Sequence, residues 1–178
     1  MKGNKVASRY AKALLDLAVE KNSLDQVNND MLHVAQVLDE SKDLSAVLGS
    51  PVISPDKKAT ILDAVFEKNI SPMSIGFLRL IVKKTRAGIL TEIADSFISH
   101  YKKHNNILDV YLTSAVALDN SVKEKVLIKV KAKHTGQVNL IEKIDTNLIG
   151  GFVVRMDDAQ LDASIANQLT NLKNLLLN

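Results

Sequence analysis

The sequence predicts an α + α/β two-domain chain, with a bundle of six helices over residues 1–105 followed by a small α+β domain over residues 106–178. Three observations predict this division. A length of 178 residues allows one ordinary domain or two small ones. Apolar residues recur at helical spacing through the first hundred residues, whereas runs rich in β-branched residues appear only after Asn106. We therefore expect two small hydrophobic cores.

Helical periodicity and turn signals place the six helices of the first domain. The serines Ser23, Ser54 and Ser71 stand where N-caps are expected. Pro55 and Pro72 follow two of these serines at the first helical position, where no N–H is needed. Short connections between successive helices are typical of a bundle. The expected helices cover residues 4–20, 24–38, 43–48, 55–66, 72–86 and 89–105.

The second domain is expected to run strand–helix–strand–strand–helix (β-α-β-β-α). Strands are expected at 107–114, 138–144 and 151–156, with a helix from Asn120 or Ser121 to near Gly136. Turns are expected at 145–147 and 157–158, and the C-terminal helix at 164–177. Two glycines, Gly150 and Gly151, open the third strand and indicate a bulge or a close backbone approach.

The composition argues against an enzyme. The chain has no cysteine, which removes disulfides, thiolate nucleophiles and Cys-based metal sites, and no Ser or Thr has a plausible base. His100 and His104 have the spacing of a metal pair, but no third ligand accompanies them. The aspartates at 157, 158 and 162 lack the spacing of a calcium loop. We expect no catalytic residue, metal or cofactor.

The charge pattern leaves one alternative function, an RNA- or ribosome-associated binding protein. The net charge is +3, with the whole excess in the helical half, and the strand order resembles that of an RNA-binding domain. Such domains stack bases on aromatics at alternate strand positions, and here only Phe152 is aromatic. The longest stretch without charge, 44–55, is shorter than the ~20 residues of a membrane span.

Two helices have wider apolar faces than a surface helix needs. On a wheel of about 100° per residue, the apolar arc covers roughly 180° in the first helix and roughly 220° in the fifth. A surface helix needs about 100°. The excess indicates either a groove for a partner helix or burial on all sides. The candidate partner-binding residues are Tyr10, Leu14 and Leu17 on the first helix, Phe77 and Ile81 on the fifth, and Ile165, Leu169 and Leu172 on the C-terminal helix.

Several segments match a known family. They are residues 8–18, residues 48–51 with Lys57, and residues 77–78 with Arg86, Leu90 and Ile93. The most specific is a C-terminal signature of residues 144–145, 148–152 and 154–155, followed by Asp162, Ser164 and Ile165. Over essentially its whole length the chain resembles the delta subunit of the rotary proton-translocating ATP synthase, the counterpart of the mitochondrial oligomycin-sensitivity-conferring protein. It departs from the family at Gly76, where Asn is common, and at 157–158, where Gly-Asp is usual.

The resemblance implies a non-catalytic stator subunit that serves ATP synthesis and proton transport. Residues 1–105 would bind the catalytic head, with the first and fifth helices receiving the N-terminal helix of an alpha subunit. Residues 106–178 would dock onto the b subunits of the peripheral stalk. The resemblance implies no cofactor and no nucleic acid. Contact with the membrane would come only through the complex, on the cytoplasmic face of a bacterial inner membrane.

Overall fold

The chain divides into two compact units, Met1–Tyr101 and Lys102–Asn178. The structure is a computed structural model that describes residues 5–115, 120–131, 136–145, 148, 150–156, 159–165, 167 and 169. The expected turn at Asp157 and Asp158 and the candidate Leu172 lie outside the described residues.

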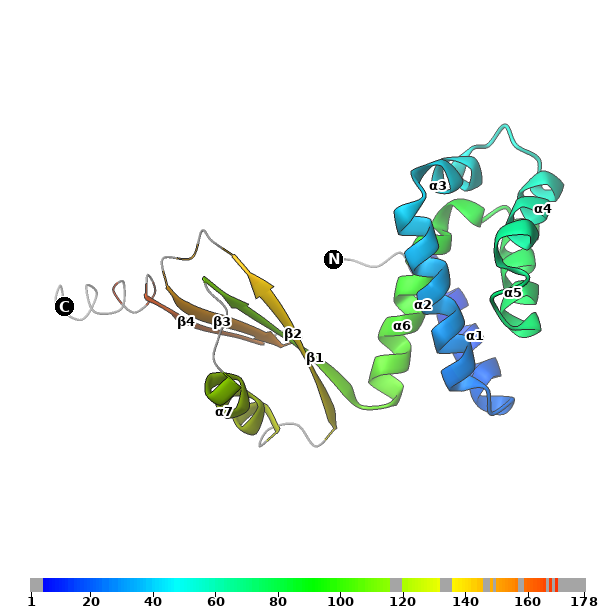
Figure 1. Ribbon diagram of the computed structural model, residues 1–178. Helices are drawn as coiled ribbons and strands as arrows, with labels where there is room; N and C mark the ends of the chain where they lie inside the picture. Colours follow the sequence, from blue (N-terminus) through cyan, green and yellow to red (C-terminus); the bar gives the residue numbers. More distant parts are fainter. Residues whose placement is uncertain are drawn as a thin grey trace. The chain divides into compact units, whose positions relative to one another are not determined.

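The first unit is built from helices around one hydrophobic core (Figure 1). Its elements are α1 (Lys5–Glu20), α2 (Leu24–Glu40), α3 (Lys42–Gly49), α4 (Pro55–Phe66), α5 (Pro72–Lys83), a 3₁₀ turn η1 (Ala87–Ile89) and α6 (Leu90–His104). Helix α2 packs against α1, α3 and α5, α4 packs against α5, and η1 packs against α3. Helices therefore occupy each of the six segments where the periodicity predicts them.

Left-handed residues close the carboxyl ends of α1 and α5. Asn22 after α1 and Thr85 after α5 have φ of 51° and 56°. In both turns an amide reaches back five residues, from Ser23 N to Ala18 O at 2.9 Å and from Arg86 N to Ile81 O at 3.0 Å. These bonds satisfy carbonyls that the helix end leaves free. The fifth helix therefore ends at Lys83, three residues before the expected Arg86.

All three serines occupy the predicted N-cap positions, but only Ser71 forms a side-chain cap hydrogen bond. Ser71 Oγ accepts a hydrogen bond from Ser74 N at the start of α5. Ser54 makes no side-chain cap bond, although Pro55 does open α4. Ser23 also makes no such bond, because its hydroxyl donates instead to Met73 Sδ at 3.7 Å. Ser41, which is not among the three predicted caps, caps α3 by accepting from Leu44 N.

A buried carboxylate on α2 holds the start of α5. Asp30 is 7% exposed, and its Oδ2 accepts hydrogen bonds from Ser71 N at 3.0 Å, Ser71 Oγ at 2.6 Å and Ser74 Oγ at 2.6 Å. The amino end of a helix carries a partial positive charge, which favours an anion there. Three donors and the helix dipole thus take the place of water around this carboxylate. We call Asp30, Ser71 and Ser74 the Asp30 cluster.

Polar contacts also join other helices of the first unit. Arg79 Nε on α5 donates to Asp63 Oδ1 on α4 at 2.8 Å, and this hydrogen bond raises the pKa of the arginine. On the other side of the bundle, Ser8 Oγ lies 3.0 Å from His100 Nε2, and Tyr101 Oη donates to Asp25 Oδ1 at 2.8 Å. Helix α6 is thereby tied to both α1 and α2.

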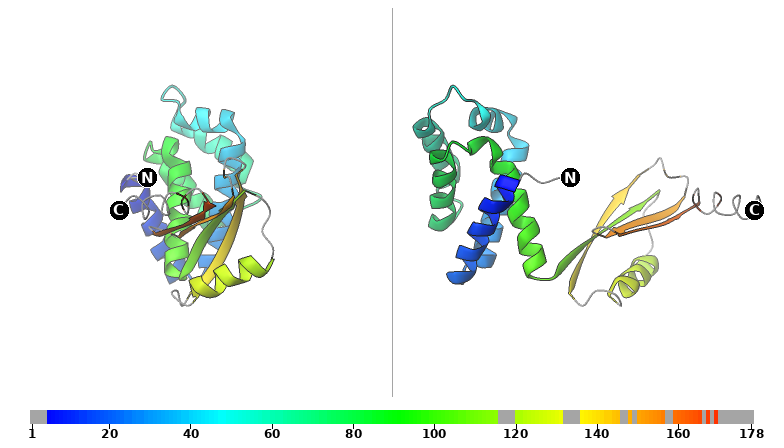
Figure 2. Two further views of the ribbon diagram at one scale, coloured as in Figure 1. Left: turned by 90° about the vertical axis from the view of Figure 1, so that its left-hand side faces the viewer. Right: turned by 180° about the vertical axis from the view of Figure 1, so that it is seen from behind.

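The second unit is a four-stranded sheet with one helix packed on it (Figure 2). Its elements are β1 (Ile107–Ser114), α7 (Asn120–Lys131), β2 (Gln137–Ile144), β3 (Gly151–Met156) and β4 (Ala159–Ser164), in the strand order β2-β1-β3-β4. Strand β1 pairs parallel with β2 and antiparallel with β3, and β3 pairs antiparallel with β4.

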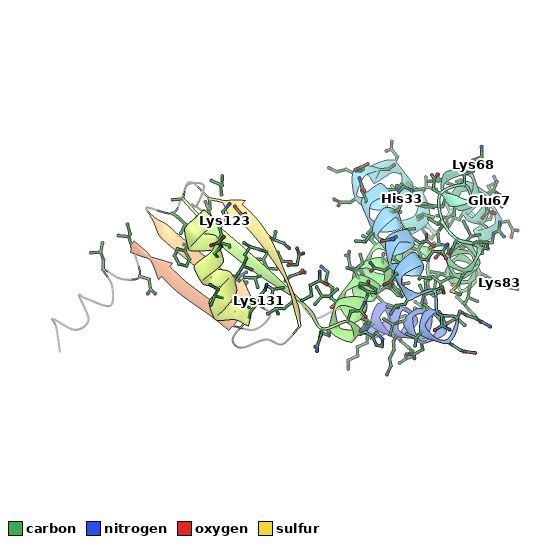
Figure 3. The ribbon with its side chains drawn as sticks, turned by 60° about the horizontal axis from the view of Figure 1, so that its bottom comes forward. His33, Glu67, Lys68, Lys83, Lys123 and Lys131 are labelled. Carbon is green, nitrogen blue, oxygen red and sulfur yellow. The ribbon has the colours of Figure 1, made fainter. Side chains whose placement is uncertain are left out.

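One face of this sheet and α7 enclose the second core. Val110, Leu112 and Val154 from the strands pack with Val126 and Val130 from α7. Figure 3 labels Lys123 and Lys131, which stand at opposite ends of α7. Lys123 Nζ lies 2.8 Å from Glu142 Oε1 on β2, so an ion pair joins the helix to the sheet.

The predicted order strand–helix–strand–strand–helix omits β4. This strand follows β3 after a two-residue connection, with Met156 opposite Ala159. Its sequence, AQLDAS, has a single large apolar residue, so the alternation is weak, and pairing with β3 decides its conformation. Of the helix expected at 164–177, Ser164 belongs to β4 and Ile165, Asn167 and Leu169 are helical. The other residues of that stretch from Ala166 on lie outside the described part.

The expected close backbone approach is confirmed at Gly150. Its φ is +156°, and a Cβ placed there would lie 2.6 Å from Ile165 Cδ1. Ile165 N also donates to Gly150 O at 3.0 Å. The residue that follows β4 therefore packs directly on the backbone that precedes β3.

We expect Asp30→Ala to lower the free energy of unfolding by about 2–4 kcal/mol, because it leaves buried donors without an acceptor. Asp30→Asn should cost less, since its amide oxygen can still accept. Urea unfolding followed by circular dichroism measures both. Asp16→Ala, on the exposed side of α1, is the control. A loss below about 0.5 kcal/mol for Asp30→Ala would contradict the role of the Asp30 cluster.

Gly150→Ala should destabilise the second unit by about 1–3 kcal/mol, because alanine is strained at this φ; the contact with the end of the exposed Ile165 side chain adds little, since that side chain can shift. Gly76→Ala is a matched control, since nothing lies within 4 Å of a Cβ there and alanine favours a helix. Thermal unfolding measures both variants. Equal melting temperatures for the two variants would refute the account of Gly150.

Asp95→Asn on α6 should stabilise the protein at pH 7 and have no effect near pH 3. Asp95 is exposed, but partial desolvation of its carboxylate raises its pKa above 3.8, and the charges of Asp39 and Glu92 raise it further. The folded chain therefore holds this proton more tightly than the unfolded chain, and stability falls as the pH rises through the interval above 3.8. The gain at pH 7 should be a few tenths of a kcal/mol, measured by urea unfolding at both pH values. A gain of the same size at pH 3 would contradict this.

Candidate functional site

The histidine pair that has metal spacing gains no third ligand among the described residues. His100 Nε2 makes its contact with Ser8 Oγ on α1 at 3.0 Å. No group of three His, Cys, Asp or Glu side chains that could hold a metal occurs in the part of the chain that the structure describes. Among those same residues, no helix combines the length and the apolar character that crossing a membrane requires.

Helix α1 has a buried face and a half-exposed apolar face. Ala7, Ala11, Leu14 and Ala18 lie in the core. Next to them runs a stripe at spacings of four, three and four residues, in which Val6 and Tyr10 are half-buried and Ala13 and Leu17 are exposed. Residues at these spacings share one face of a helix.

Helix α5 has the same division. Ile75, Leu78, Ile81 and Val82 are buried with Ser74. The outward stripe consists of Met73 and Phe77, which are half-buried, and Gly76 and Leu80, which are exposed. Leu80 is 45% exposed, which is high for a leucine in the middle of an apolar arc.

The two stripes belong to helices that both pack against α2. Ser23, which follows α1, donates to Met73 Sδ, so the carboxyl end of α1 lies beside the start of α5. Ala13 and Gly76 are small, and small residues allow a partner's backbone to come close. We call this surface the α1–α5 face; its residues are Val6, Tyr10, Ala13, Leu17, Met73, Gly76, Phe77 and Leu80.

The structure corrects two of the candidate residues. Leu14 is 1% exposed and Ile81 is 0% exposed, and both belong to the hydrophobic core. A helical wheel gives the width of an apolar arc but does not divide it between the core and solvent. Tyr10, Leu17 and Phe77 do reach the outward stripes. Met73 and Leu80 lie in the same apolar arc of the helical wheel as Phe77. They are not among the candidates because aromatic residues are preferred as anchors.

The candidate residues of the second unit are only partly described. Ile165 and Leu169 are both exposed, and Leu172 lies outside the described residues. Ile165 also packs against Gly150, so it has a structural role beside its exposure. Ile128 on α7 and Ile144 at the end of β2 are two further exposed apolar residues, which the sequence analysis does not select.

Comparison with known proteins assigns the chain to a family. The model of the ATP synthase delta (OSCP) subunit family matches residues 6–176. The ATP synthase subunit delta of Cytophaga hutchinsonii is 38% identical over 98% of this chain and 95% of its own length. That of Chlorobium phaeobacteroides is 39% identical over 94% of this chain and 93% of its own length.

A solved structure agrees with this assignment. A chain in the cryo-EM structure of the Toxoplasma gondii mitochondrial ATP synthase hexamer superposes with a TM-score of 0.75 and 25% identity, and 97% of each chain is covered. The similarity of sequence and that of fold both extend over nearly the whole chain. The chain belongs to the ATP synthase delta (OSCP) subunit family.

Proposed function

We propose that this chain is the non-catalytic subunit of an ATP synthase peripheral stalk that links the catalytic head to the b subunits. It would hold the head still while proton flow turns the rotor, so that torque drives ATP synthesis. The full-length match to relatives named ATP synthase subunit delta carries the proposal. In this role the chain lies at the cytoplasmic face of a bacterial inner membrane and contacts the membrane only through the complex.

The α1–α5 face is the proposed site for the N-terminal helix of an alpha subunit. Its apolar stripes run at helical spacing on α1 and α5, which the Ser23–Met73 hydrogen bond joins at one end, and they remain half-exposed. An amphipathic helix recognises such a surface by placing residues at i, i+3, i+4 and i+7 into it. Exposed Arg9 and Lys12 lie beside the stripe on α1 and would meet acidic residues at the rim of the interface.

A subunit that resists torque needs slow release more than fast binding. Release is slow when apolar anchors are fully desolvated and the binding surface is already in place. On the α1–α5 face, the half-buried Tyr10 and Phe77 pack against the core while part of each ring stays accessible. A partner helix would complete their burial at little cost in side-chain entropy.

The second unit is the proposed attachment to the b subunits. Exposed Ile165 and Leu169 support this role, because they follow the last strand at helical spacing and give that end of the unit an apolar surface. Leu172 would extend the same stripe, as its spacing in the sequence suggests.

The alternative of an RNA-associated protein receives no support from the sheet. Phe152 packs against the core between the sheet and α7, so it cannot stack on a base. Tyr111 is exposed on the opposite face, where the described neighbours on β2 and β3 include Ile141, Val153 and Arg155. A single accessible aromatic ring does not make the stacking platform of an RNA-binding sheet.

Leu80→Asp should weaken binding of a synthetic alpha N-terminal peptide by about 10–100-fold, because a buried leucine contributes about 1.5–3 kcal/mol. Isothermal titration calorimetry with the full chain measures the dissociation constant. Leu32→Asp is a matched control, since Leu32 on α2 is also 45% exposed but lies outside the α1–α5 face. Equal affinities for the Leu80 and Leu32 variants would exclude the α1–α5 face as the site.

A further inference from the structure

A cavity lies in the first unit, between the loop that joins α3 to α4 and the turn that joins α5 to η1. Its volume is about 360 Å³. Both loops appear in Figure 1, next to α3 and at the end of α5. None of the residues of the α1–α5 face lines it, so it is a separate surface.

The missing side chain of Gly88 allows these loops to come together. A Cβ placed on Gly88 would lie 3.3 Å from Gly49 Cα, which is tighter than ordinary van der Waals contact. Thr85, which precedes Gly88 in this turn, has a left-handed backbone conformation with a φ of 56°. The cavity wall is therefore built from backbone in fixed turns as well as from side chains.

Two cations lie on a wall that is otherwise largely apolar. Lys58 Nζ donates to Leu48 O at 2.7 Å, which uses one of its three protons. The side chain of Arg86 is exposed, and its guanidinium forms no hydrogen bond or ion pair with any residue that the structure describes, although the backbone of Arg86 bonds to Ile81. Beside these cations lie Ile53, Val82 and Ile89.

The surroundings of the cavity are also basic. Residues 49–60 and 82–89 contain five Lys or Arg and one acidic residue, Asp56. The net charge of these two short segments is therefore +4, which exceeds the net charge of +3 of the whole chain. Val52, in the loop that lines the cavity, is 91% exposed and offers an apolar contact beside the charges. A positive surface next to apolar side chains suits a ligand that has both a negative charge and apolar groups.

We propose that this cavity binds an acidic peptide segment of a partner protein. A Glu or Asp carboxylate would accept hydrogen bonds from Arg86, whose planar guanidinium matches a carboxylate with two parallel bonds, and from Lys58. A neighbouring apolar side chain would pack against Ile53 and Ile89. A free phosphate would leave these apolar walls in water, which is why a peptide fits better. The proposal does not depend on the proposed function.

Nuclear magnetic resonance of the ¹⁵N-labelled full chain tests this site. The probe is the blocked tripeptide acetyl-Leu-Glu-Leu-amide, with acetyl-Leu-Gln-Leu-amide and inorganic phosphate at equal ionic strength as comparisons. The Glu peptide should bind with a dissociation constant of about 1 mM, and it should shift the amides of Gly49, Ile53, Gly88 and Ile89. The Gln peptide should bind at least fivefold more weakly.

Variants assign the binding to the cavity. Arg86→Gln should weaken the Glu peptide at least fivefold, while Lys83→Gln should change its affinity less than twofold. Lys83, labelled in Figure 3, is a nearby exposed cation that does not line the cavity. Unchanged spectra with the Glu peptide, equal binding of the Gln peptide, equal shifts with phosphate, or equal effects of the two variants would each overturn the proposal. The wild-type comparison of peptides holds even if Arg86→Gln disturbs the fold.

Discussion

The hydrogen bonds of Asp30 fix how helix α5 faces the rest of the first unit. Its carboxylate accepts from both Ser71 and Ser74, and Ser74 is fully buried, so the first turn of α5 cannot rotate without breaking charge-assisted bonds. That orientation places Ile75, Leu78 and Ile81 in the core, and it leaves Phe77 and Leu80 outside. It also determines where Val82, at the end of α5, and the turn that follows lie in the wall of the cavity that contains Lys58 and Arg86. Both surfaces of the first unit that we assign to partners therefore depend on one buried carboxylate.

The two units suit the proposed linking role in different ways. The first has a large core, and two of its helices, α1 and α5, also have apolar stripes that are partly exposed to solvent. The second has a much smaller core, with one helix on one face of a sheet, so local contacts such as that of Ile165 with Gly150 matter more to its stability. A chain that transmits force needs two attachment surfaces and no reactive groups. The absence of cysteine from the sequence and the balanced charge agree with that role.

The helices could be predicted from the sequence because of their apolar periodicity and turn signals, and the first three strands because they are rich in β-branched residues. Strand β4 could not, since AQLDAS lacks a pattern and takes its conformation from pairing with β3. The excess of apolar surface on α1 and α5 was visible in the sequence, but its division between core and solvent was not. Leu14 and Leu17 lie in the same arc, and only the packing of neighbouring helices buries the first and exposes the second. The Asp30 cluster and the cavity at Arg86 join residues far apart in the sequence, so no local pattern could reveal them.

Site-specific cross-linking in the assembled complex tests most directly whether the α1–α5 face attaches the chain to the catalytic head. A photoreactive amino acid replaces Leu80 in one variant and Leu32 in another, and each variant is irradiated in detergent-solubilised ATP synthase before mass spectrometry of the products. The account predicts that position 80 cross-links to the N-terminal segment of an alpha subunit and that position 32 does not. Cross-links from position 80 only to other subunits, or only within the chain itself, would contradict it.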